Sequence, residues 1–178
     1  MGSIFLSAGH GGDDPGAVAN GRREADIAVD MRNMVALYVE RAGVKFETDG
    51  KLKVNDPLRR AVVQARRHPL AIEFHCNAAS SQASGVETLS APKDFDLGNK
   101  LCRVVADCLG IRNRGAKPEN AGQHHRLAFV QAGGIIMELF FITNKSDLAN
   151  YDKYKWLAAR HMADILMKEV KHGKVANR

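Results

Sequence analysis

The sequence predicts an α/β fold: a single domain with a mostly parallel, twisted sheet of about six strands flanked by helices. Short apolar runs at residues 3–8, 70–76 and 135–141 indicate buried strands, and segments with helical spacing separate them. Strands that alternate with helices favour a parallel sheet. The 178 residues, 45% of them hydrophobic, suit one compact domain, and no linker rich in Pro, Gly or Ser divides them.

In the first half of the chain, a strand at residues 3–8 leads into a loop rich in Gly, Asp and Pro at residues 9–20. A helix follows at residues 24–42, where apolar side chains at helical spacing form one stripe: Ile27, Met31, Met34, Val35, Tyr38 and Ala42. Gly43 supplies a stop signal for this helix. The next expected elements are a strand at 44–48, a basic helix at 58–68 and a buried strand at 70–76.

The second half continues the alternation of strands and helices. Its expected elements are a strand at 85–90, a helix at 94–109, strands at 127–131 and 135–141, and a long helix at 151–171. Gly133 and Gly134 join the two later strands. The long helix has an apolar set made of Trp156, Leu157, Ala163, Ile165, Leu166 and Val170.

The net charge of +6 indicates attraction to an anionic partner, for which nucleic acid, a membrane surface and an anionic cell wall are candidates. The alternative is a solvated surface with an excess of lysine. Basic residues do not alternate with aromatic ones, so a nucleic-acid module is not expected. No apolar run approaches the roughly 18–20 residues that cross a bilayer, and no signal peptide is visible. The three cysteines form an odd, sparse set, which predicts reduced thiols.

Two histidines occur at the ends of expected strands. His10 comes just after the strand at 3–8, and His75 lies at the end of the strand at 70–76. In parallel α/β sheets, ligands bind beyond the carboxyl ends of the strands. A lone histidine in such a place is more often structural. Two at equivalent strand ends favour a shared ligand.

Glu24 extends the apolar stripe of the helix at 24–42, because it lies three residues before Ile27 and seven before Met31. A carboxylate on a buried face needs a partner, since desolvating it without one is costly. The residue therefore has two interpretations. It is either an acid favoured by the dipole at a helix N-terminus or a metal ligand.

Glu138 interrupts the apolar run at 135–141. A carboxylate inside such a strand usually has a chemical role or a cationic partner. Burial favours its protonated form and suits it to proton transfer. We therefore regard Glu138 as a candidate catalytic residue, with a buried ion pair to Arg or Lys as the alternative.

Three other residues compete for a place in such a site. Glu73 lies two residues before His75, so both side chains face the same side of the strand. Glu73 is able to orient the histidine or to bind a metal itself. His124 and His125 are also candidates, but they occur in a polar loop without a strand end to fix them.

These residues occur in motifs that resemble the zinc-dependent N-acetylmuramoyl-L-alanine amidases of the amidase-3 type. The likeness begins with AGHGGDDPGA at residues 8–17 and continues with Glu24 at the start of the next helix. It extends through three later motifs: HCNA at 75–78, GVET at 85–88, and Glu138 followed by FITN at 141–144. Order and spacing agree from residue 4 to about residue 168. Five motifs in register are far more specific than any one of them.

The resemblance implies one zinc ion per chain, held by His10, Glu24 and His75, with water in an open position. Three protein ligands and an open position are typical of catalytic zinc. Such a zinc would lower the pKa of its water toward about 7 and polarise the scissile carbonyl. Glu138 would pass the proton of that water to the leaving amine. The bond cut would be the amide between N-acetylmuramic acid and L-alanine in peptidoglycan.

Two positions depart from the family pattern. Ser7 and Ala8 replace the usual Asp-Pro before the Gly-His pair, and Glu73 replaces a small polar residue and adds negative charge near the expected zinc. Residues 1–178 are assigned to one amidase catalytic domain, with a core at about 3–170 and a basic tail at 171–178.

The chain is similar to single-domain phage endolysins, although a domain of a host autolysin would look alike. We therefore expect a lytic enzyme, monomeric, with peptidoglycan and not nucleic acid as its partner. If it is phage-derived, it would be made in the cytoplasm and act on the wall after release. Two alternatives stay open: a zinc peptidase of cell-wall stem peptides, and a non-catalytic protein that binds wall polymer or nucleic acid.

The basic tail generates a first prediction. Lysines and an arginine are concentrated near the C-terminus, at Lys168, Lys171, Lys174 and Arg178. Deleting residues 171–178 should lower activity on whole walls more than on a soluble muropeptide, because cations speed encounter with an anionic polymer. The difference should shrink as added salt screens the charges. Equal losses on both substrates would show that the tail is structural instead.

Overall fold

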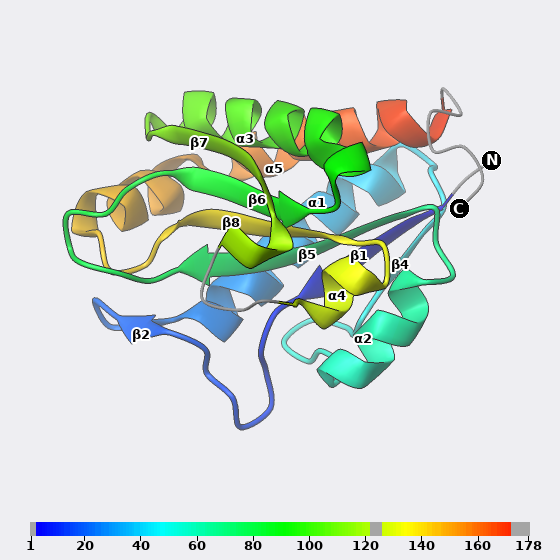
Figure 1. The fold of residues 1–178 in the computed structure, drawn as a ribbon, viewed down its shortest axis with the longest axis horizontal. Coiled ribbons are helices and arrows are strands. Elements are labelled where there is room, and N and C mark those ends of the chain that lie inside the picture. The colour runs from blue at the N-terminus through cyan, green and yellow to red at the C-terminus, as the bar shows by residue number, and fades with distance from the viewer. Residues whose placement is uncertain (1–2, 122–125, 172–178) are drawn as a thin grey trace.

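The computed structural model describes residues 3–121 and 126–171. Its main sheet has six strands in the order β4-β1-β5-β8-β6-β7 (Figure 1). Neighbouring strands are parallel except β6 and β8, which are antiparallel. The strand bounds are β1 Ile4–Ala8, β4 Phe46–Thr48, β5 Leu70–Asn77, β6 Val86–Ser90, β7 Asn113–Pro118 and β8 Ile135–Phe141. The expected α/β class and largely parallel sheet are confirmed.

Helices cover both faces of this sheet, but unequally (Figure 1). Three long helices lie on one face: α1 Glu24–Arg41, α3 Phe95–Leu109 and α5 Lys145–Lys171. Two short helices lie on the other: α2 Leu58–Ala65 and α4 Ala128–Gln131. Short 3₁₀ turns occur at Pro92–Asp94 and Glu119–Ala121, and β2 Val18–Ala19 pairs with β3 Arg22–Arg23 in a small hairpin.

Alternation along the strands creates two cores of different size. On β1, Ile4 and Leu6 join the large core beneath the long helices, whereas Phe5 joins the small core beneath α2 and α4. The same alternation on β8 sends Ile135 and Met137 to the large core and Ile136 to the small one. The short helices cover the small-core face of the sheet only partly. Polar side chains that point to this face near the strand ends therefore lie on a partly covered side of the sheet.

Two elements differ from the sequence prediction. Residues 127–131 are not a strand; all but the first of them form α4, whose adjacent residues Phe129 and Val130 are both buried in the small core. Adjacent residues cannot face one side of a strand, but they can on one helical turn. The sixth strand is instead β7, which the sequence prediction missed. Its residues, NRGAKP, carry no apolar alternation because β7 is a polar edge strand.

The last helix also differs from its prediction. It begins at Lys145, six residues earlier than expected, because the Asn144 side chain accepts hydrogen bonds from the backbone N–H groups of Ser146 and Asp147 at 2.9 and 3.1 Å. Trp156 and Leu157, expected in its apolar set, are 50% and 44% exposed. None of the helices in the described part of the chain is long and apolar enough to cross a membrane.

A buried ion pair joins α1 to the end of β4. Arg32 Nη1 lies 2.8 Å from Asp49 Oδ1, and neither side chain is exposed. The second oxygen of Asp49 accepts hydrogen bonds from Ser7 Oγ and the Ala8 backbone N–H, both at 3.0 Å. The pair thus fixes the carboxyl end of β1, from which the chain continues to His10.

A second prediction follows from this pair. Arg32→Met should lower the free energy of unfolding by about 3–5 kcal/mol, because it leaves the Asp49 carboxylate buried without its cation. Arg22→Met is the matched control, since Arg22 pairs with Asp152 at the surface and its loss should cost under about 1 kcal/mol. Urea unfolding of both variants measures the difference. Similar small losses would mean that the buried pair contributes little.

Candidate active site

His10 lies in a tight turn directly after β1. Its φ of +64° is in the left-handed region, which a residue with a side chain adopts only when its surroundings hold it there. The Asn55 side-chain amide supplies that support by donating hydrogen bonds to the carbonyls of Ala8, at 2.8 Å, and of His10. On the imidazole, Nδ1 lies 2.8 Å from the Asp14 carboxylate. The ring is therefore fixed with Nε2 directed away from Asp14.

His75 lies on β5, on the small-core face of the sheet. Its Nδ1 is 3.0 Å from Glu24 Oε1, and its Nε2 is 3.2 Å from Glu73 Oε1. The imidazole lies against the backbone of Gly9, where a Cβ would come within 2.1 Å of the ring. Gly9 therefore allows the two histidines to approach, and their ring centroids are 5.0 Å apart.

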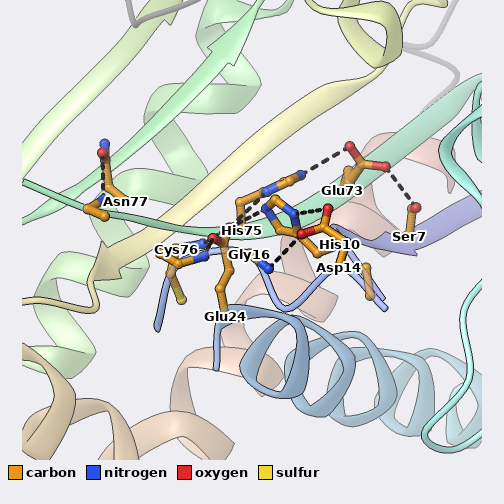
Figure 2. A network of polar contacts seen from close by, with 12 residues as sticks. Ser7, His10, Asp14, Gly16, Glu24, Glu73, His75, Cys76 and Asn77 are labelled. Atoms are coloured by element: carbon orange, nitrogen blue, oxygen red, sulfur yellow. Dashed lines mark hydrogen bonds and ion pairs between the residues drawn. The ribbon is translucent and has the colours of Figure 1, made fainter. Parts of the chain in front are cut away.

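Glu24 is the first residue of α1, and its buried carboxylate joins both histidines (Figure 2). Oε1 lies 3.1 Å from His10 Nε2 and accepts a hydrogen bond from the Cys76 backbone N–H at 3.0 Å. Oε2 accepts one from the Ala17 backbone N–H at 2.9 Å. Burial acts to raise the pKa of Glu24, but the hydrogen bonds with His10 and His75 outweigh it and hold the pKa well below the usual range. The carboxylate is ionised.

These three side chains fit a metal ion. One ligand atom from each of His10, Glu24 and His75 can be chosen so that all three lie within 4.8 Å of one another. Ligand atoms around a tetrahedral zinc are roughly 3.4 Å apart, close to the histidine–glutamate separations of 3.0 and 3.1 Å. Two imidazole nitrogens and one carboxylate are also the ligand types that zinc takes in hydrolases. The structure brings together the three residues predicted as ligands.

Glu138 lies beside this cluster, paired in the sheet with His75 on one side and Glu87 on the other. Part of its side chain reaches the cleft, but Oε2 is buried and has no hydrogen-bond partner among the described residues. Burial raises the pKa of Glu138 to about 7, although the nearby His75 opposes the shift. No Lys or Arg of the described residues forms an ion pair with it, so the ion-pair alternative finds no support here.

The other candidates take different places. Glu73 is buried, its Oε2 lies 3.0 Å from Ser7 Oγ, and it contacts His75 from the side away from Glu24. It does not belong to the group of three metal-type side chains. His124 and His125 lie outside the described residues.

All these groups line one cleft of about 900 Å³ at the carboxyl ends of β1, β5 and β8. Its far wall holds three charged residues that our sequence interpretation gave no role: Glu87, Arg114 and Lys117. Glu87 lies within a recognised motif, so its position was available from the sequence. The two cations were missed together with β7, the strand that carries them.

The site combines metal-type ligands with a carboxylate, Glu138, whose Oε2 has no hydrogen-bond partner among the described residues. Such a combination at the carboxyl edge of an α/β sheet is typical of hydrolytic enzymes. The chain belongs to the Amidase_3 family, N-acetylmuramoyl-L-alanine amidase, which matches residues 4–168. It is thus an amidase of bacterial cell-wall peptidoglycan, and the family inferred from its motifs is confirmed.

Known proteins are similar to this chain in sequence, and one of them is also similar in fold. A crystal structure from Neisseria meningitidis, provisionally assigned as an N-acetylmuramoyl-L-alanine amidase, has 48% identity and a TM-score of 0.87, with 96% of each chain covered. The amidase LytC of Bacillus subtilis is 29% identical over 91% of this chain but only 34% of its own length. The endolysin of Bacillus phage SPP1 is 28% identical over 96% of this chain and 68% of its own length.

A third prediction concerns Glu138. Glu138→Gln keeps the shape of the side chain but cannot accept a proton. Hydrolysis should fall by about 10²–10⁴-fold, the usual contribution of a positioned acid–base group, while the fold is kept. Turnover and circular dichroism on the same sample measure the two effects.

The stability of the metal-free variant supplies an independent readout. Because the folded-state pKa of Glu138, about 7, lies above its ordinary value of 4.5, this group stabilises the fold below about pH 4.5, and the contribution is lost as pH rises through 7. Glu138→Gln should therefore be more stable than the wild type at pH 8, on the order of 3 kcal/mol at most, and lose this advantage in acid. A variant several kcal/mol less stable at pH 8 would instead reveal a cationic partner.

Proposed function

We propose that the chain is a zinc hydrolase that cuts the amide between N-acetylmuramic acid and L-alanine, and that it acts as a lytic enzyme. One observation carries the proposal: the ligand-type atoms of His10, Glu24 and His75 converge next to a carboxylate, Glu138, whose Oε2 has no partner in the described part of the chain. A structural ion-pair network would leave no such oxygen, since buried polar atoms are normally paired.

His10, Glu24 and His75 would hold the zinc, and Glu138 would act on protons. Zinc there would polarise the scissile carbonyl and acidify water. Glu138, once ionised, accepts the proton of the attacking water and returns it to the leaving amine. Burial raises the pKa of Glu138 in the metal-free protein, which helps this carboxylate to hold the accepted proton until the leaving amine takes it.

Two carboxylates hold the histidine rings in position. Asp14 lies 2.8 Å from His10 Nδ1, and Glu73 lies 3.2 Å from His75 Nε2. Each contact leaves the opposite ring nitrogen, His10 Nε2 or His75 Nδ1, directed at Glu24. Carboxylates that fix the tautomer and direction of a ligand histidine are common around metals. Glu73 is thus assigned to orienting His75, not to binding zinc.

The lytic role is supported by the likeness to the SPP1 endolysin, which extends over nearly the whole chain. In this proposal the enzyme is made in the cytoplasm and reaches the wall after release. As the catalytic domain acts on a polymer, an open cleft at the sheet edge suits a substrate that cannot be enclosed.

Product analysis on purified peptidoglycan tests the bond that is cut. Cleavage at the proposed amide creates new amino-terminal L-alanine without new reducing sugars. A stem-peptide peptidase, the alternative enzyme, would release amino acids or expose other amino termini. New reducing ends would point to a glycosidase and would refute the proposed reaction.

A fourth prediction separates the zinc ligand from its orienting neighbour. The wild type should bind one zinc per chain and lose activity on chelation. Glu24→Gln should weaken zinc binding most, because it removes the only charged ligand. Glu73→Gln is the matched control, a buried glutamate touching the same histidine, and should cost only about 10–100-fold in affinity. Competition with a chromogenic chelator measures both, and the reverse order would make Glu73 the ligand.

A further inference from the structure

The charges that line the cleft are distributed very unevenly. Among the described lining residues, seven are carboxylates: Asp14, Glu24, Asp56, Glu73, Glu87, Glu119 and Glu138. Arg114 and Lys117 are the only Lys or Arg among them, and both come from β7. Carboxylates therefore dominate the described lining of the cleft, and its Lys and Arg side chains lie on one strand only.

Two contacts hold the guanidinium of Arg114, and its Nη edge has no partner among the described residues. Its Nε donates a hydrogen bond to Glu87 Oε2, and its guanidinium carbon lies 5.0 Å from the centroid of the Phe141 ring. These contacts fix the plane of the guanidinium, whereas its two Nη groups have no partner among the described residues. A guanidinium with a free Nη edge is suited to bidentate binding of a carboxylate.

Arg114, Lys117 and Glu87 form a cluster that carries a net positive charge. Lys117 Nζ lies 2.6 Å from Glu87 Oε2, and Asn77 Nδ2 donates to Glu87 Oε1 at 3.0 Å. Glu87 is one anion between two cations and therefore neutralises only one of them. About a quarter of each basic side chain, 28%, is still exposed in the cleft wall.

The position of this cluster indicates which carboxylate it would meet. Glu87 lies two strands from His75, across β8, which is roughly 10 Å at a strand spacing of about 4.8 Å. An extended peptide advances about 3.4 Å per residue, so this span corresponds to two or three residues. The carboxyl of muramic acid is already consumed in the scissile amide, so the free carboxylates of the substrate are on the peptide.

We propose that Arg114 and Lys117 form a subsite for a free carboxylate of the stem peptide, two or three residues beyond the scissile amide. This inference rests on the proposed function and names the part of the substrate that the enzyme selects. A competing explanation is that both cations only fasten β7 to β6 through Glu87. That explanation predicts effects that do not depend on the substrate.

Matched substrates separate the two explanations. The parent is a synthetic muramyl tripeptide, and in two analogues a carboxamide replaces the carboxylate of either the second or the third residue. The wild type should lose about 10–100-fold in kcat/KM, through KM, on one analogue, because a charge-assisted pair is lost. The analogue affected identifies which carboxylate binds. Equal rates on all three substrates would overturn the proposal without any variant.

Variants complete the test. Arg114→Met should lose about 10–100-fold on the parent and under about threefold on the affected analogue, and Arg114→Lys should recover part of the loss. Arg112→Met, an exposed residue outside the cleft with the same charge change, is the control and should stay within about twofold. Equal loss on every substrate would assign Arg114 a structural role. Failure of the proposed function differs visibly, because the wild type would then cleave none of the substrates.

Discussion

The site depends on one desolvated carboxylate. Glu24 starts α1 beneath the sheet, and a buried anion persists only where other groups compensate for lost water. His10 from the end of β1, His75 and the Cys76 backbone N–H from β5 supply that compensation. The same contacts bring three separate segments of chain to one point. The contacts that stabilise the Glu24 carboxylate are therefore the same contacts that assemble the site. A metal cation could take the place of the protons that the two histidines share with this carboxylate.

The strands that could be predicted from their apolar runs are those that are buried along most of their length. Strands β1, β5 and β8 are continuous apolar runs because helices cover both of their faces. Strand β7 lacks this signal, since it lies at the edge of the sheet beside β6 and none of its residues is fully buried. Helix α4 is too short for periodicity to distinguish it from a strand. The local hydrophobic pattern of a segment predicts its secondary structure only where all its residues share one kind of tertiary environment.

The same limit applies to the site. His75 and His10 were candidates because they lie at or just after the ends of apolar strands, Glu138 because it interrupts such a strand, and Glu24 because it extends an apolar stripe. Their grouping as metal ligands was implied only by the family motifs, and the structure shows that His10, Glu24 and His75 do lie together. Arg114 and Lys117 break no pattern, since cations are ordinary on a polar segment. Their importance arises from an excess of carboxylates contributed by other segments, which only the folded chain assembles. The contacts that orient the histidines were equally inaccessible, apart from Glu73, whose spacing from His75 revealed a shared face.

The difference in size between the two hydrophobic cores affects which part of the fold unfolds locally most easily. Helices α2 and α4 are held by a small cluster around Phe5, Phe129 and Ile136, whereas the long helices share a core several times larger. Local unfolding free energies rise with buried apolar contact, so amide protons in the thin layer should exchange before those of the long helices. Leu58 and Leu127 at its margin also line the cleft. Local opening of this layer would therefore displace Leu58 and Leu127 from the cleft wall, whereas Glu24 and His75 are carried by α1 and β5, which pack in the large core.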